Sequence, residues 1–122
     1  MLVAPSINLL YTYLVYNYIM LLQKNDKVIN QSIVDLTENA LNNIKKVPSH
    51  IKAKLLVWVD SVEQLGIHEV RKIPGYHDEP LKGKRTDQRS IRLSKAYRAI
   101  YVMTNKGNID IIAVTEVNKH EY

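Results

Sequence analysis

The sequence predicts an α+β fold in which an N-terminal helical hairpin packs on one face of a small, mainly antiparallel, twisted β-sheet. Three observations lead to this prediction. The length of 122 residues suits one domain with one hydrophobic core. Two stretches with apolar residues at helical spacing follow one another between residues 36 and 65, and three strand-like stretches close the chain. Because a pair of helices must bury its apolar side, we expect it to cover the sheet that the strands form.

Residues 1–27 are an apolar extension with several open interpretations. The first 23 residues contain no charged side chain and hold four of the eight tyrosines. They lack the positive start and the small-residue cleavage site of a signal peptide. Asn8, Asn17 and the tyrosines make them a poor membrane span. Secretion or membrane spanning is one interpretation. The others are an apolar helix or strand packed on the core, or a start codon assigned too early, with translation beginning at Met20.

The domain itself is expected at residues 28–122, where a strand is followed by two helices. "KVINQSIVDLT" predicts a short strand around Val28 to Val34. "LTENALNNIKKV" places its apolar residues on one helical face, with Thr37 as the N-cap, and this helix should stop at Pro48. The second helix has Pro48 near its start and Gly66 as its C-cap. Its apolar positions, three and four residues apart, are Ile51, Leu55, Trp58, Val59, Val62 and Leu65.

Three consecutive strands are predicted after a loop. "RSIRLS" and "AYRAIYVMT" alternate bulky apolar with polar residues, and "NIDIIAVTEV" is rich in Ile and Val. Between the last two, "TNKGN" is a good hairpin turn with Gly107 available for a positive φ. If Ile91 and Leu93 face the helices, the side chains of Arg92 and Arg98 must point away from them. The open face of the sheet is therefore expected to be cationic.

Charge and composition narrow the class of partner. The formal charge of +5 is concentrated between Arg71 and Lys106, where ten Lys or Arg stand against three acids. A polyanion is the natural partner of such a segment. The chain has no cysteine, which excludes disulfides and thiolate zinc sites and suits a reducing cytoplasm. No phosphate-binding glycine motif is present, so we expect no nucleotide cofactor, and no metal-ligand spacing relates the four histidines, His50, His68, His77 and His120.

The basic segment has the residue types of a phosphate site. Arginines on a sheet face are usually only solvated. Here, however, further cations in the preceding loop could lie over the same face, and guanidinium groups bind phosphate oxygens bidentately. The cations concerned are Lys82, Lys84, Arg85, Arg89, Arg92 and Arg98.

A carboxylate and a histidine complete a set for proton transfer. In RNA the 2′-hydroxyl can attack the adjacent phosphate if a base removes its proton, cations stabilise the phosphorane and an acid protonates the leaving oxygen. Glu79 in "HDEPLKGKR" and His120 in "NKHEY" supply the two proton-transfer groups. About half of such histidines are ordinary surface groups with no catalytic role. The unperturbed pKa of histidine, near ~6.5, nevertheless suits it to proton transfer.

The same residues carry a resemblance to a known family. "EPLKG" at 79–83, "RSIRLSKAYRAIY" at 89–101 and "VNKHEY" at 117–122 resemble the RelE/ParE superfamily of toxin-antitoxin toxins, and in spacing the RelE/YoeB-like mRNA interferases. The resemblance covers residues 28–122, as a RelE/ParE-like toxin domain. The loop and strands are also similar to the YafQ branch, in which a histidine stands at the place of Glu79. In YoeB-like proteins a tyrosine directly follows the acid histidine, whereas here Glu121 intervenes before Tyr122.

The resemblance implies a function and roles for individual residues. It implies a metal-independent, ribosome-dependent endoribonuclease that cleaves mRNA in the cytoplasm and is neutralised by an acidic antitoxin. Glu79 would be the general base and His120 the general acid. Arg92 and Arg98 would bind the scissile phosphate, and Tyr122 would pack against a base. The residues expected to bind RNA are Lys82, Lys84, Arg85, Arg89, Lys95 and Lys119.

Two alternatives of different class remain open from the sequence. A non-catalytic ParE-like toxin that inhibits DNA gyrase has the same fold and needs no cleavage residues. A decayed, inactive toxin would account for the unusual residues 1–27. Glu79 and His120 at their positions favour the ribonuclease.

Overall fold

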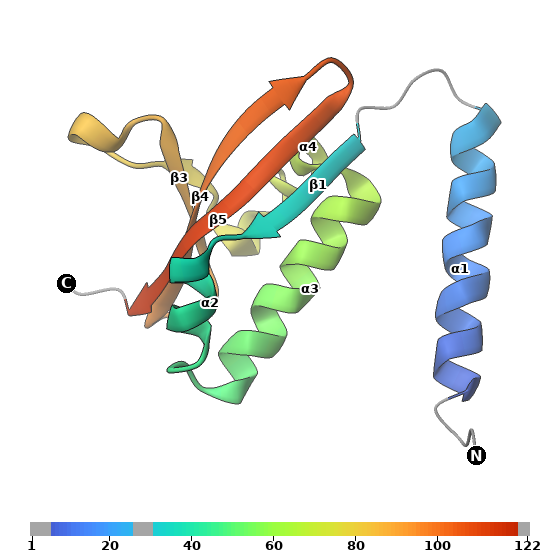
Figure 1. The fold of residues 1–122 in the computed structure, drawn as a ribbon, viewed down its shortest axis with the longest axis horizontal. Helices are drawn as coiled ribbons and strands as arrows, with labels where there is room; N and C mark the ends of the chain where they lie inside the picture. The colour runs from blue at the N-terminus through green and yellow to red at the C-terminus, as the bar shows by residue number, and fades with distance from the viewer. Residues whose placement is uncertain (1–5, 26–30, 120–122) are drawn as a thin grey trace.

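The predicted α+β architecture is confirmed by one five-stranded sheet with helices on one face (Figure 1). The computed structural model describes residues 6–25 and 31–119, and in the first range it describes the side chains of residues 11–20 only. The strand order is β1-β5-β4-β3-β2; β1 runs parallel to β5, and every other pair is antiparallel. The strands are β1 (Gln31–Leu36), β2 (Glu79–Pro80), β3 (Gln88–Arg92), β4 (Tyr97–Lys106) and β5 (Ile109–Lys119).

The predicted helical hairpin consists of α2 (Glu38–Ile44) and α3 (Ser49–Leu65). The hydroxyl of Thr37 caps α2 by accepting a hydrogen bond from the Ala40 backbone N–H at 3.2 Å. Pro48 is the N-cap of α3, and Gly66 ends that helix with a φ of 88°. This positive φ lets the chain turn directly into a further short helix, α4 (Ile67–Val70), which the sequence pattern does not reveal because four residues cannot display a helical period.

Removing the cap at Thr37 is expected to weaken the helical layer. Thr37→Ala leaves an N–H of the first turn without its side-chain acceptor and also removes the 3.3 Å hydrogen bond from the Thr37 hydroxyl to the Thr115 carbonyl. We expect the free energy of unfolding to fall by about 1 kcal/mol, measured by urea denaturation. Thr37→Ser, which keeps the hydroxyl, is the control. Equal losses in both variants would contradict a capping role.

The hydrophobic core lies between α3 and the sheet. Trp58 on α3 is fully buried and packs against Tyr101 on β4, with 5.4 Å between ring centroids. Ile91 and Ala99 on neighbouring strands join the same cluster, so the predicted alternation in β3 and β4 is confirmed. Arg92 and Arg98 consequently project from the face that the helices do not cover. The other core residues include Ile51, Leu55, Val62, Ile112, Val114 and Val117.

A β-bulge adjusts the pairing of β4 with β5. Ile100 pairs with Glu116, but the next residue, Tyr101, pairs with Val114, so one residue of β5 has no partner. Without the bulge, Val114 and Val117 would point to opposite faces, because side chains alternate along a strand. With it, both are buried in the same core. The bulge thereby lets a single strand bury both valines on the same face of the sheet.

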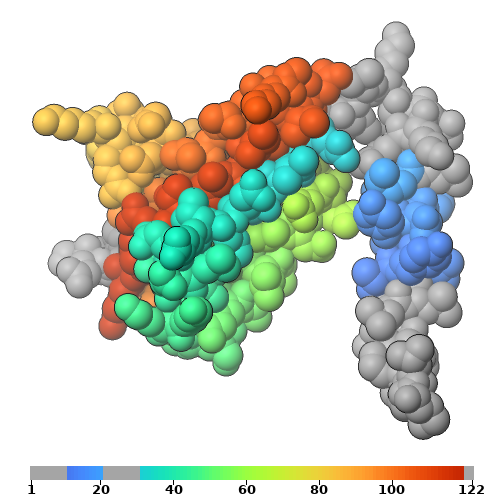
Figure 2. Space-filling view, viewed as in Figure 1, coloured from blue at the N-terminus to red at the C-terminus, as the bar shows by residue number. Residues whose placement is uncertain are grey.

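The segment between α4 and β3, expected to be a loop, contains short elements that build the sheet edge. They are the 3₁₀ turns η1 (Pro74–Tyr76) and η2 (Gly83–Arg85), with β2 between them. β2 has two residues, one of them proline, and therefore gives no strand signal in the sequence. Its pairing places Glu79 opposite Ser90. The gold segment around η2 projects from the body of the domain (Figure 2).

The N-terminal extension contains a helix, α1 (Ser6–Asn25), which stands apart from the sheet and its helices in Figure 1. A helix was one of the expected forms. Among its residues 11–20, whose side chains the structure describes, none belongs to the core cluster, and Tyr11, Tyr13 and Tyr18 are each more than 60% exposed. Within residues 6–25 and 31–119, no helix is long and apolar enough to cross a membrane.

Candidate active site

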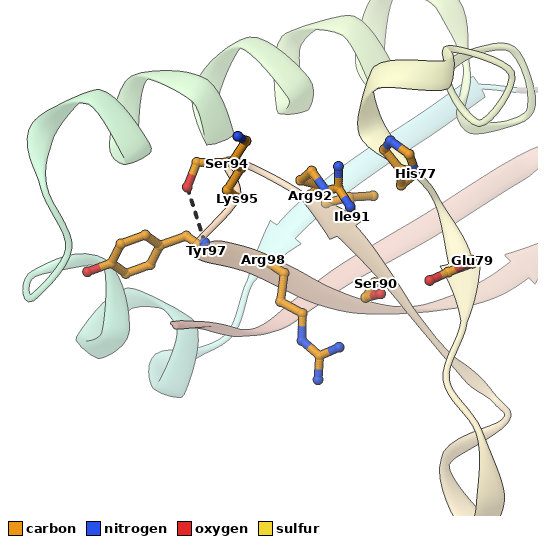
Figure 3. Close-up of a pocket in the computed structure, with 9 residues that line it drawn as sticks. All are labelled: His77, Glu79, Ser90, Ile91, Arg92, Ser94, Lys95, Tyr97 and Arg98. Carbon is orange, nitrogen blue, oxygen red and sulfur yellow. Dashed lines mark hydrogen bonds between the residues drawn. The ribbon is translucent and has the colours of Figure 1, made fainter. Parts of the chain in front are cut away.

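A pocket on the open face of the sheet brings together the main residues singled out in the sequence (Figure 3). Glu79 enters it from β2, Arg92 from β3 and Arg98 from β4. Three cationic side chains and one carboxylate line the pocket, so its field favours an anionic ligand. The complete lining is His77, Glu79, Ser90, Ile91, Arg92, Ser94, Lys95, Tyr97 and Arg98.

Strand register fixes how these groups face one another. Glu79 lies opposite Ser90, which in turn lies opposite Ile100, so this row runs across β2, β3 and β4. Arg92 lies opposite Arg98 in the neighbouring row. Side chains two positions apart in a strand share a face. The register therefore assigns Glu79, Arg92 and Arg98 to the same side of the sheet as Ser90. Figure 3 shows the Arg98 guanidinium directed away from Arg92.

The turn between β3 and β4 holds the two arginines opposite each other. The hydroxyl of Ser94 accepts hydrogen bonds from the backbone N–H groups of Ala96 and Tyr97, both at 3.1 Å. The Leu93 N–H donates to the Tyr97 carbonyl at 2.9 Å and closes the hairpin. The turn thus fixes the register that pairs the arginines.

The arginine pair is electrostatically unfavourable in the absence of an anion. Like charges directly opposite on adjacent strands repel one another. In addition, the Nε of Arg98 is shielded from solvent and has no hydrogen-bond partner among the described residues. A charged donor left without a partner costs about 1–3 kcal/mol. A phosphate between the two guanidinium groups would relieve the repulsion, and this defines a candidate anion site.

Neutralising one arginine is expected to stabilise the free protein. Arg92→Gln removes the repulsion across the strands, and we expect the free energy of unfolding to rise by about 0.2–1 kcal/mol at low salt. Urea denaturation of Arg92→Gln and of Lys106→Gln, which makes the same charge change at an exposed position of β4, measures the difference. A gain of equal size in both variants would attribute the effect to net charge and contradict a specific repulsion.

The predicted loop cations are only partly gathered at this pocket. A second hollow adjoins the first and shares Glu79, Ser90 and Arg98 with it; Lys82 and Arg85 also line it. The Arg85 guanidinium donates to the Gln88 side chain at 2.7 Å and forms an ion pair with Glu116 on β5, which ties η2 to the open face. Lys84 is exposed in η2 and lines neither hollow.

Arg89 is placed differently from the other predicted RNA ligands. It lies one residue from Ser90 and hence on the opposite face of β3. Its Nε donates to the Asp78 carboxylate at 2.6 Å, and the Asp78 side chain is only 1% exposed. Burial by itself lowers the pKa of Arg89, but the hydrogen bond and ion pair with Asp78 outweigh it, and the pKa is raised. The structure does not bring Arg89 to the pocket.

The C-terminal predictions are only partly within the described residues. Lys119, the last described residue, is exposed and pairs with Tyr97, which lines the pocket. His120 and Tyr122 lie outside the described residues. Lys95, another residue expected to bind RNA, lines the pocket.

Ser90 and His77 are among the pocket residues that were not singled out for a role in the sequence. Ser90 shares the open face with Arg92, and strand alternation was the signal that could have found it. His77 was considered only among the four histidines that show no metal-ligand spacing. Its φ of 44° is a left-handed conformation that a residue with a side chain rarely adopts, and it occurs beside Glu79 in the pocket. Sequence does not show such a backbone outlier.

No group of three or more His, Asp or Glu side chains within residues 6–25 and 31–119 is arranged to hold a metal ion. The described pocket residues supply one carboxylate, one imidazole, hydroxyl groups and cations. These groups can transfer protons and stabilise negative charge.

The comparison with protein-family models gives no match, and the comparison with curated proteins gives none either. Solved structures do match. A YoeB/ParE toxin from Agrobacterium tumefaciens superposes with a TM-score of 0.55 at 16% identity, covering 73% of this chain and 99% of that one. The chain has the fold of the RelE/ParE toxins. For YafQ in the E. coli DinJ-YafQ complex, the TM-score is 0.56 at 17% identity, with 74% of this chain and 94% of that one covered.

A third match to the RelE/ParE toxin fold comes from the toxin-antitoxin complex RelBE2 of Mycobacterium tuberculosis. Its TM-score is 0.54 at 17% identity, and the match covers 72% of this chain and 96% of that one. The fold expected from the resemblance is thus confirmed. The matches cover 99%, 96% and 94% of the three neighbours, so nearly the whole fold of each is present in this chain.

Proposed function

We propose that this protein is the toxin of a type II toxin-antitoxin system and acts as a ribosome-dependent endoribonuclease that cleaves mRNA. The observation that carries the proposal is the pocket in which Glu79 stands beside the cross-strand pair Arg92 and Arg98. A carboxylate that can accept a proton and a cationic site that can bind a phosphate are two of the three needs of phosphodiester cleavage without a metal, the third being an acid for the leaving oxygen. The RelE/ParE fold supports the assignment to this class of toxin.

Glu79 is the proposed general base. It is exposed at the rim of the pocket and can therefore reach a substrate hydroxyl. In the proposed reaction its carboxylate takes the proton of the ribose 2′-hydroxyl, whose oxygen attacks the adjacent phosphorus. The bond from phosphorus to the 5′-oxygen of the next nucleotide then breaks. The products are a 2′,3′-cyclic phosphate and a free 5′-hydroxyl.

Arg92 and Arg98 are the proposed ligands of the scissile phosphate. Negative charge grows on the non-bridging oxygens as the phosphorane forms, and guanidinium groups already in position stabilise it without reorganisation. The Nε of Arg98 has no hydrogen-bond partner among the described residues, so a movement of the side chain that exposes it would supply a donor for one of these oxygens. The repulsion between the arginines in the free protein falls when the anion binds, which favours the bound and transition states.

His120 is the proposed general acid for the leaving 5′-oxygen, and Tyr122 is proposed to pack against a base. Both proposals rest on the family resemblance. The chain position of His120 is compatible with this role, because the preceding residue, Lys119, is paired with the pocket residue Tyr97.

Cations around the pocket are proposed to draw in the RNA. Lys82, Lys84 and Arg85 in the projecting segment, Lys95 beside the pocket and Lys119 at the end of β5 would contact phosphates of mRNA or of ribosomal RNA. Such contacts are independent of sequence and weaken as salt increases. In the cytoplasm, an acidic antitoxin would be attracted to the same positive charge. Two of the structural neighbours named above are toxin-antitoxin complexes.

The proposal is tested by adding the purified protein to ribosomes programmed with a defined mRNA and mapping the cut ends. Cleavage that leaves a 2′,3′-cyclic phosphate and a 5′-hydroxyl is expected. A supercoiling assay with DNA gyrase is run in parallel. Intact mRNA would overturn the proposal, and intact mRNA together with blocked supercoiling would identify a non-catalytic ParE-like toxin instead.

A further inference from the structure

A buried charged cluster lies directly behind the pocket, on the helix-facing side of the sheet edge. At its centre the Asp78 carboxylate accepts hydrogen bonds from the Arg89 Nε and from the Tyr101 hydroxyl, both at 2.6 Å. The Arg89 guanidinium also donates to the Asp78 backbone carbonyl at 3.3 Å. Arg71, at the end of α4, donates to the Tyr101 hydroxyl at 3.1 Å. The cluster therefore joins α4, β3 and β4 to one residue of the segment that precedes β2.

The cluster keeps its charges and protons in place. Burial raises the pKa of the Tyr101 phenol, and its hydrogen bond to Asp78 raises it further, so the phenol stays protonated as a donor. Arg89 remains charged for the reason given above. Asp78 is therefore held by one cation and one neutral hydroxyl, from two different strands. Hydrogen bonds that involve a charged group are stronger and more strictly oriented than neutral ones.

The residues around Asp78 alternate between buried anchors and pocket residues. Tyr76 is 8% exposed, and the Asp78 side chain is 1% exposed. His77, which lies between these two residues, and Glu79, which follows them, are exposed and line the pocket. The left-handed conformation of His77, at a φ of 44°, connects the two anchors. A conformation of this kind persists only where the surroundings impose it.

β2 alone cannot impose this conformation. It consists of two residues at the edge of the sheet, and one of them is a proline that has no N–H to donate. After β2, the Leu81 N–H donates to the Gln88 carbonyl at 2.8 Å, the last backbone tie before the projecting segment. The ion pair of Asp78 with Arg89 thus adds to the β2–β3 pairing in fixing the backbone next to Glu79.

We propose that Asp78 is a positioning residue: its buried pairing with Arg89 and Tyr101 holds the segment Tyr76–Glu79 so that Glu79 and His77 face the arginine pair. The catalytic part of this proposal rests on the proposed ribonuclease function, and the positional part does not. Asp78 itself faces the core and touches no substrate. Arg89 accordingly supports the site through Asp78, on the core side of the sheet, and is not an RNA ligand.

The test compares Asp78→Asn with Asp87→Asn, which makes the same charge change at an exposed position of the same segment. Two quantities are measured: the hydrogen exchange of the Leu81 amide by NMR, and kcat and KM for mRNA cleavage on programmed ribosomes. In Asp78→Asn we expect the Leu81 amide to exchange about tenfold faster, because local opening at the β2 edge becomes easier. We expect kcat to fall about 10²-fold with KM within twofold, because a displaced base is lost from the transition state rather than from binding.

Tyr101→Phe serves if Asp78→Asn does not fold, because it removes one donor to Asp78 and leaves the ring in the core. It should shift both quantities in the same direction, by less. Unchanged Leu81 exchange in a folded variant overturns the positional part, whatever the activity. Faster exchange with unchanged kcat overturns the catalytic part. If the wild-type protein cleaves no mRNA, the ribonuclease proposal and the catalytic part fail together, while Leu81 exchange still decides the positional part.

Discussion

Glu79→Gln is expected to lower the rate of mRNA cleavage by about 10²–10⁴-fold, the usual contribution of a general base. Glutamine has nearly the same shape as glutamate but cannot take the proton of the 2′-hydroxyl. Because Glu79 is exposed, the variant should fold normally and keep the Tm of the wild type within a few degrees. The measurement is single-turnover cleavage on programmed ribosomes. KM should change little, since the base acts on the transition state.

The control for this prediction is Glu69→Gln, which removes one carboxylate from a surface ion pair with Lys72. It should cleave mRNA at the wild-type rate, because an exposed pair of this kind contributes little. If Glu79→Gln were as active as Glu69→Gln, the proton would have to be accepted by another group. His77, the imidazole that shares the pocket with Glu79, would then be the residue to replace next.

The layers of this fold could be predicted because long, regular patterns encode them. Apolar residues spaced by three and four over Ser49–Leu65 gave α3, and Gly66 marked its end. Alternation in β3 and β4 assigned Ile91 to the core and Arg92 to the open face. These patterns extend over several turns or residue pairs, so a single exception does not conceal them.

The edge of the sheet could not be predicted because contacts distant in sequence determine it. Nothing near Asp78 in the sequence shows that its carboxylate is buried; Arg89 and Tyr101, 11 and 23 residues away, make that possible. β2 exists because it pairs with β3, and its own two residues disfavour a strand. The β-bulge before Tyr101 has the same origin, since it serves the burial of two valines in β5.

Arg89 shows a limit of predicting RNA ligands from the charge of a segment in the sequence. It was grouped with the loop cations as an expected RNA ligand because it stands in the same basic segment. Its place in the strand alternation, two residues from Ile91, assigns it to the core side instead. A local charge count identifies a basic segment, whereas the alternation of side chains along the strand decides which of its members reach the open face.

Arg98→Gln is expected to reduce cleavage by about 10²–10³-fold, because it removes a positioned donor from the developing charge on the phosphate. It should also raise the Tm slightly, since the repulsion from Arg92 and the unpartnered Nε both disappear. Arg98→Lys keeps the charge but loses the planar fork, so it should recover only part of the activity.

Cleavage assays and thermal unfolding of the two variants, with Lys106→Gln as the control for net charge, provide the measurements. Opposite changes in activity and stability would distinguish a phosphate ligand from a structural arginine, whose loss would lower both. A variant that loses stability together with activity would therefore contradict the assignment of Arg98 to the anion site.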